Sequence, residues 1–108
     1  MDEPAFSGLR VVDFSQGIAG PHCGMLLAQH GAEVIKIEPM EGDWCREIGK
    51  QYGDQSSNSI VYNRGKKSIA LNVKNTDGLA IAKSLCKSAD VIIENYRPGV
   101  LAKFGLDE

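Results

Sequence analysis

The chain has few cysteines, and none of them stand close enough in sequence to form a metal-binding pair. Cys23, Cys45 and Cys86 are odd in number and widely spaced, and there is no C-x-x-C motif. His22 and His30 lie apart, and only Cys23 neighbours either of them. Zinc sites use clustered ligands, so we expect no metal site. The cysteine pattern and the absence of a signal-peptide pattern favour a reducing, cytoplasmic setting.

The sequence also lacks long apolar segments and an excess of either charge. No segment approaches the roughly 20 apolar residues that a transmembrane helix needs. The net charge is −2 over 108 residues, whereas proteins that neutralise nucleic-acid phosphates carry a basic excess. We therefore expect a single domain over residues 1–108, with neither membrane nor nucleic acid as a partner.

The charges that are present are unevenly distributed along the chain. The first half is acidic, and most of the basic residues follow it: Arg64, Lys66, Lys67, Lys74, Lys83, Lys87, Arg97 and Lys103. One interpretation is an ordinary solvated face. The other is a site for a small molecule that carries phosphate groups.

Apolar segments and turn residues alternate in a way that predicts alternating strands and helices. We expect strands at 9–14, 33–38, 68–73 and 90–94, and helices at about 22–30, 76–88 and 100–104. Residues 39–58 show no period and predict a long, mobile loop with a helical turn near 44–48, and 60–63 is either a brief helix or extended. This order predicts an α/β fold, a Rossmann-like parallel sheet with flanking helices.

The segment 91–99 combines a fold signal with a candidate site. Its Val/Ile run is typical of a strand buried on both faces, and Asn95, Tyr96 and Arg97 follow directly. In parallel sheets, ligands bind just beyond the carboxyl ends of the strands. Tyr96 therefore either covers the sheet edge or stacks on a ligand, and the residues alone do not decide between these.

Known nucleotide-binding motifs are not matched. Gly17 and Gly20 are spaced wrongly for the dinucleotide motif G-x-G-x-x-G, and Pro21 removes an N–H that would face a pyrophosphate. The basic turn at 63–68 lacks the leading glycine of a P-loop. That turn is either a charged surface hairpin or a phosphate anchor.

Five ordered blocks, at residues 9–15, 19–21, 31–38, 63–69 and 89–99, together resemble the family III CoA-transferases. This family includes formyl-CoA transferase, the carnitine CoA-transferase group and α-methylacyl-CoA racemase. The resemblance implies a Rossmann-like domain that binds CoA, and an aspartate that attacks an acyl-CoA thioester. A mixed anhydride and an enzyme-bound thioester follow, and a small carboxylic acid then takes up CoA. It also implies an interlocked homodimer and no permanently bound cofactor, with CoA or acyl-CoA as substrate.

Matching the family motifs residue by residue implies a set of CoA contacts. They are Ile18 and Ala19 in the first turn, Leu71, Asn72, Val73 and Lys74 along the third strand, Asn95, Tyr96 and Arg97 after the fourth, and Lys103 on the last helix. CoA carries several phosphates, an adenine and a long amphipathic arm. Lys74, Arg97 and Lys103 suit the phosphates, Tyr96 suits the adenine, and the apolar strand ends suit the arm.

The chain also departs from the family pattern. Ile18 stands where formyl-CoA transferase has a glutamine, which disfavours a formyl or oxalyl substrate, and Pro39 replaces an arginine found in several members. No aspartate here aligns with the family's nucleophile, so we assign no catalytic residue. We expect the N-terminal CoA-binding part of a longer transferase, inactive alone. The alternatives are an acyl-CoA racemase of the same family or a non-catalytic Rossmann-like module; a nucleotide-binding oxidoreductase ranks below both.

Overall fold

The computed structural model describes residues 3–106, whose centre is a four-stranded sheet. Its strands are β1 (Arg10–Asp13), β2 (Glu33–Glu38), β5 (Lys67–Ala70) and β6 (Val91–Ile93). They lie in the order β5-β2-β1-β6, and each neighbouring pair is parallel. The predicted fold class, a Rossmann-like parallel sheet, is confirmed.

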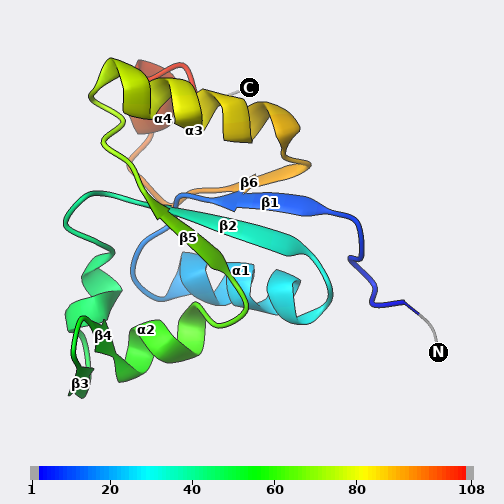
Figure 1. The fold of residues 1–108 in the computed structure, drawn as a ribbon, viewed down its shortest axis with the longest axis vertical. Coiled ribbons are helices and arrows are strands. Elements are labelled where there is room, and N and C mark those ends of the chain that lie inside the picture. The colour runs from blue at the N-terminus through cyan, green and yellow to red at the C-terminus, as the bar shows by residue number, and fades with distance from the viewer. Residues whose placement is uncertain (1–2, 107–108) are drawn as a thin grey trace.

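Helices cover both faces of this sheet (Figure 1). α1 (Ala19–Gln29) and α2 (Ser57–Tyr62) lie on one side, and α3 (Thr76–Ser88) and α4 (Val100–Lys103) on the other. The buried apolar side chains accordingly form two clusters. One contains Val11, Ala32 and Val34; the other contains Val12, Phe14, Ile37, Leu71, Ala82 and Leu106. Alternation along β1 sends Val11 to the first cluster and Val12 to the second.

α3 forms as the sequence predicts. The Asn75 side chain accepts a hydrogen bond from the Asp77 N–H and caps the helix. Ala82 is fully buried, and Leu79, Leu85 and Cys86 pack against the same cluster. These inward positions recur at helical spacing, and this is why the sequence pattern located them.

α1 begins earlier than predicted, at Ala19 rather than at residue 22. Pro21 therefore lies inside the first turn, where its missing N–H has no helical partner to lose. The buried residues of the helix are Pro21, Gly24 and Met25. Gly24 packs against the Asp13 carboxylate, since a Cβ there would lie 2.7 Å from Asp13 Oδ2. A small residue thus lets the helix approach β1.

The prediction of a structureless loop over 39–58 is wrong, although the short helical turn near Trp44 is confirmed. The segment contains a 3-10 helix η1 (Trp44–Glu47) and a hairpin of β3 (Gln51–Tyr52) and β4 (Gln55–Ser56), and α2 starts at Ser57. Side chains cap these elements: Asp43 accepts from the Cys45 N–H, and Ser56 and Ser59 form a capping box. Because polar side chains hold these short elements, the sequence of this segment shows no hydrophobic period that would predict them. The mobility of this segment stays a prediction.

Two predictions about strands need correction. β6 is an edge strand, and Val91 and Ile92 are each 39% exposed, so it is not buried on both faces. The local apolar run does not reveal which neighbours a strand has. β5 ends at Ala70, so Leu71, Asn72, Val73 and Lys74 follow the strand instead of lying along it.

Within residues 3–106, none of the helices is long and apolar enough to cross a membrane.

Candidate functional site

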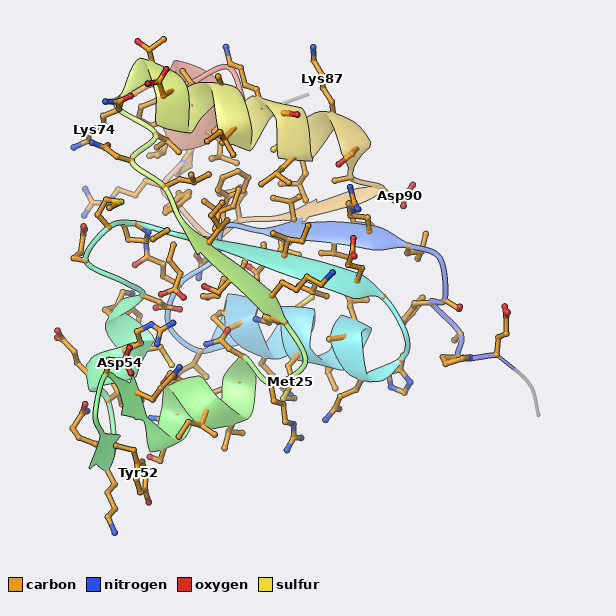
Figure 2. The ribbon with its side chains drawn as sticks, in the orientation of Figure 1. Met25, Tyr52, Asp54, Lys74, Lys87 and Asp90 are labelled. Atoms are coloured by element: carbon orange, nitrogen blue, oxygen red, sulfur yellow. The ribbon has the colours of Figure 1, made fainter. Side chains whose placement is uncertain are left out.

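The carboxyl ends of the four strands meet at one edge of the sheet. Hydrogen bonds continue the pairing past the strands: the Phe14 N–H donates to the Ile93 carbonyl (2.8 Å), and the Leu71 N–H to the Glu38 carbonyl (2.9 Å). The segments after each strand therefore lie side by side, at 14–20, 39–44, 71–75 and 94–97. Lys74 is at this edge, whereas Asp90, which precedes β6, is at the opposite end (Figure 2).

The strand order of the sheet reverses at β1. β2 and then β5 lie on one side of β1, whereas β6, the next strand of the sheet along the chain, lies on the other side. Ligands of open α/β sheets bind in the crevice at such a switch point. Here the two flanking segments are joined: the Asn95 Nδ2 donates to the Gln16 carbonyl (2.8 Å), and the Gln16 N–H donates to Asn95 Oδ1 (3.1 Å).

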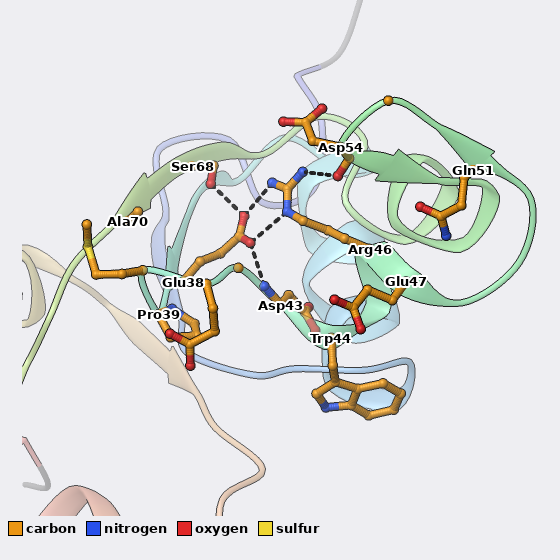
Figure 3. Close-up of a pocket in the computed structure, with 14 residues that line it drawn as sticks. Glu38, Pro39, Asp43, Trp44, Arg46, Glu47, Gln51, Asp54, Ser68 and Ala70 are labelled. Atoms are coloured by element: carbon orange, nitrogen blue, oxygen red, sulfur yellow. Dashed lines mark hydrogen bonds and ion pairs between the residues drawn. The ribbon is translucent and has the colours of Figure 1, made fainter.

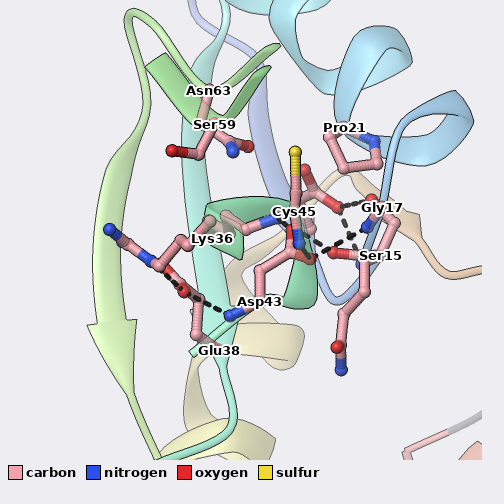
Figure 4. A network of polar contacts seen from close by, with 12 residues as sticks. Ser15, Gly17, Pro21, Lys36, Glu38, Asp43, Cys45, Ser59 and Asn63 are labelled. Atoms are coloured by element: carbon pink, nitrogen blue, oxygen red, sulfur yellow. Dashed lines mark hydrogen bonds and ion pairs between the residues drawn. The ribbon is translucent and has the colours of Figure 1, made fainter. Parts of the chain in front are cut away.

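Beneath the turn that joins β1 to α1 lies a buried ion pair between Lys36 and Asp43, with 2.7 Å between Nζ and Oδ2 (Figure 4). Lys36 Nζ also donates to the Ser15 carbonyl (2.9 Å). Asp43 Oδ1 accepts from the backbone N–H groups of Gly17 and Cys45, both at 2.9 Å. The ends of β1 and β2 are thus connected through side chains that water does not reach.

A second buried pair joins Lys66 to Asp13, with 2.8 Å between Nζ and Oδ2. Lys66 also donates to the Pro21 carbonyl and to Asn63 Oδ1. Burial lowers the pKa of Lys66, against the opposing attraction of Asp13. The other oxygen of Asp13 accepts from the Ser15 N–H and hydroxyl. The Lys66 ammonium group is therefore buried and occupied by bonds within the protein. The interpretation of its turn as a phosphate anchor is wrong for this lysine.

A cleft of about 640 Å³ opens beyond β2, and most of the charged residues that line it are acidic (Figure 3). Glu38 stands at its base and accepts hydrogen bonds from Arg46, the Asp43 N–H and the Ser68 hydroxyl. Burial raises the pKa of Glu38, but these hydrogen bonds outweigh it and lower the pKa to about 2. Glu41, Glu47 and Asp54 add further negative charge, so this cleft is a poor place for phosphate.

A smaller, mostly apolar pocket of about 160 Å³ lies beyond β1, β5 and β6. It is lined by Phe14, Val73, Lys74, Tyr96, Val100, Leu101, Phe104 and Leu106. The structure thus brings together three of the predicted contacts, Val73, Lys74 and Tyr96, on one cavity. Tyr96 is half-buried, and this burial raises the pKa of its phenol.

The remaining predicted contacts do not line this pocket. Ile18, Ala19, Asn72 and Lys103 are exposed, so their side chains are accessible. Leu71 is buried in the core and its N–H donates to the Glu38 carbonyl, so neither its side chain nor its N–H is available to a ligand. Arg97 lines a neighbouring cavity of about 520 Å³ along β6, which shares Leu101 and Leu106 with the smaller pocket.

Sequence reasoning missed the buried pairs Lys36–Asp43 and Lys66–Asp13. One signal was present in the sequence, because Lys36 interrupts the apolar strand 34–37. In the structure Lys36 is 1% exposed. A lysine so placed needs a buried carboxylate partner. No local pattern says that the partner is Asp43.

Comparison with known proteins now decides the family. The model of CoA-transferase family III matches residues 6–108. The chain belongs to the family III CoA-transferases. It is 42% identical to a succinate–glutarate CoA-transferase of Agrobacterium fabrum, over 97% of this chain and 28% of that protein. It is 43% identical to a succinyl-CoA–D-citramalate CoA-transferase of Chloroflexus aurantiacus, over 91% of this chain and 25% of the relative.

Solved structures agree with this assignment. A CAIB/BAIF family protein from Brucella suis superposes with a TM-score of 0.91 at 36% identity, covering 99% of this family III chain and 30% of the other. A hypothetical protein from Mycobacterium tuberculosis superposes with a TM-score of 0.88 at 36% identity, with coverage of 99% and 30%. The chain spans about a quarter of the length of the curated relatives above, 28% and 25%.

Proposed function

We propose that this chain forms the CoA-binding edge of an enzyme that moves CoA from an acyl-CoA thioester to a small carboxylic acid. The observation that carries the proposal is the pocket that Tyr96, Val73 and Lys74 share at the carboxyl edge of the sheet. It offers an aromatic face, apolar walls and a cation in one place. The names of the relatives support the substrate classes, because one names CoA transfer between succinate and glutarate and the other between succinyl-CoA and D-citramalate.

Each part of CoA has a chemically suitable counterpart on this edge. Tyr96 offers the adenine a ring to stack on. Lys74, Arg97 and Lys103 are exposed cations for the phosphates. In the proposal, the pantetheine arm runs over Asn72 and Val73 toward the first turn, where Ile18 and Ala19 stand at the start of α1. The contact of Leu71 is made by its backbone carbonyl, because its N–H donates to Glu38, and Asn95 borders the site after β6.

None of the aspartates described in residues 3–106 is proposed as the nucleophile. Asp13 and Asp43 are fully or almost fully buried and held in ion pairs, so neither reaches a thioester. Asp90 is at the opposite end of the sheet, and its carboxylate accepts from the Arg10 N–H. We propose that the aspartyl-CoA thioester forms on a residue outside this chain, that the chain alone binds CoA without turning it over, and that the complete enzyme is a homodimer.

Calorimetric titration with CoA at low salt tests the proposal. We expect CoA to bind, and pantetheine, which lacks the adenine and phosphates, to bind much more weakly. Lys74→Gln should weaken CoA binding, whereas Lys87→Gln, an exposed lysine of the last turn of α3, should leave it unchanged. An absence of heat at millimolar CoA from a folded sample would refute CoA binding by this chain.

A further inference from the structure

The first turn after β1, residues 15–17, is held from below by a carboxylate on another loop. We propose that Asp43 is a positioning residue, which sets the shape of this turn and through it the affinity of the CoA site. This inference rests on the proposed function. Asp43 lies near the acidic cleft beyond β2, and it was not among the contacts that the family pattern implied.

Asp43 is connected to the turn in two ways, directly at residue 17 and through Lys36 at residue 15. One carboxylate oxygen accepts from the Gly17 N–H and the Cys45 N–H, each at 2.9 Å. The other faces Lys36 Nζ at 2.7 Å, and Lys36 in turn donates to the Ser15 carbonyl at 2.9 Å. The turn is therefore held at two backbone atoms, the carbonyl of residue 15 and the N–H of residue 17 (Figure 4).

The turn needs such support because of its backbone conformation. Gly17 has a φ of +88°, a left-handed conformation that glycine adopts without strain but does not hold by itself. The Trp44 ring covers it, and a Cβ on residue 17 would overlap that ring. From the opposite flank, Asn95 holds the N–H and carbonyl of Gln16. Ile18 and Ala19, two of the proposed CoA contacts, follow immediately.

The chemistry explains why an ionised aspartate stands here. A carboxylate has enough lone pairs to accept two N–H bonds on one oxygen and pair with an ammonium on the other. Asparagine can still accept the two N–H bonds, but its NH₂ group would then face Lys36. Alanine loses every contact. The two substitutions therefore separate the hydrogen bonds that shape the turn from the charge that neutralises Lys36.

Amide hydrogen exchange of the chain provides a readout that does not depend on CoA. In the wild type, we expect protection of the Gly17 N–H, which belongs to no helix or strand. Asp43→Ala should abolish that protection and shift the fluorescence of Trp44, the single tryptophan of the sequence. Asp43→Asn should retain part of it. Glu41→Ala, an exposed carboxylate of the same loop, is the matched control and should change neither signal.

CoA titration of the same variants then tests the effect on the site. We expect Asp43→Ala to weaken CoA binding about tenfold, the equivalent of one net hydrogen bond, and Asp43→Asn to weaken it less. Unchanged affinity in a folded Asp43→Ala protein would overturn the inference. So would rapid exchange of the Gly17 N–H in the wild type, a result that stands even if both variants fail to fold. If the wild type binds no CoA, the proposed function fails, while Gly17 exchange still reports whether Asp43 holds the turn.

Discussion

The Asn95 side-chain amide makes a pair of hydrogen bonds with the backbone of Gln16, a residue 79 positions earlier in the chain. Its Nδ2 donates to the Gln16 carbonyl (2.8 Å), and its Oδ1 accepts from the Gln16 N–H (3.1 Å). The contact joins the segments after β1 and β6, the two strands that flank the switch point of the sheet. It therefore ties the stability of the fold to the geometry of the proposed CoA site.

Asn95→Ala should destabilise the chain by about 1–3 kcal/mol, because it leaves both backbone groups of Gln16 without this partner. Asn95→Asp keeps the acceptor and loses the donor, so we expect an intermediate loss. Urea unfolding followed by circular dichroism measures both. Asn58→Ala, which removes an amide in α2, is the control, and a loss as large as that of Asn95→Ala would contradict a specific role for this contact.

Glu38 should make stability depend on acid pH. Its pKa is about 2 in the folded chain against an ordinary value of 4.5, since the bonds from Arg46, Asp43 and Ser68 outweigh burial. Between these values the unfolded chain binds more protons, so the contribution is complete above pH 4.5 and is lost as pH falls toward 2. The shift corresponds to about 3 kcal/mol.

Glu38→Gln isolates this contribution from those of other acids. We expect the variant to be less stable than the wild type at pH 7, and the difference to shrink steadily as the pH drops through the acid range. Denaturant unfolding at a series of pH values measures the difference. A gap that stays constant down to pH 2 would contradict the proposed ionisation.

Gly78→Ala should displace the turn that carries four of the proposed contacts. A Cβ on residue 78 would overlap the Asn72 carbonyl oxygen, a backbone atom that cannot rotate away. We expect a loss of about 1–3 kcal/mol, as for other overpacked sites, together with weaker CoA binding. Ser84→Ala, on the exposed face of the same helix, should have neither effect. Normal affinity and stability in Gly78→Ala would show that the turn does not depend on this approach.

Tyr96→Ala should weaken CoA binding by about 1–3 kcal/mol if the ring stacks on the adenine, and Tyr96→Phe should retain most of the affinity. Tyr52→Ala, at the exposed hairpin, is the matched control. Calorimetry gives the affinities, and thermal unfolding gives the stabilities. Unchanged affinity with a lowered melting temperature would assign Tyr96 a purely structural role.

The elements predicted best from the sequence are those whose signals are local. Helix α3 has both an Asn75 cap and inward residues at helical spacing, and its observed bounds match. The hairpin and the first turn of α2 were missed because polar caps such as those of Asp43 and Ser56 hold them, whereas the brief helix given as one alternative for 60–63 matches the end of α2. The exposure of Val91 depends on which strands flank β6, and no single strand carries that information.

The candidate site shows the same division. The family pattern pointed to Lys74, Val73 and Tyr96, and the fold brings them to one pocket. The supporting contacts were not predictable, because their partners lie far apart in sequence: 26 residues for Gly17 and Asp43, and 53 for Asp13 and Lys66. Only the folded chain shows that these side chains meet.

Nuclear magnetic resonance of the ¹⁵N-labelled chain during titration with CoA shows whether CoA binds at the carboxyl ends of the strands. We expect saturable shifts of amide signals in residues 15–20, 71–75 and 95–97, with the signals near Asp90, at the opposite end of the sheet, unchanged. A folded spectrum that does not respond to millimolar CoA, or shifts confined to residues away from the carboxyl edge, would contradict this prediction.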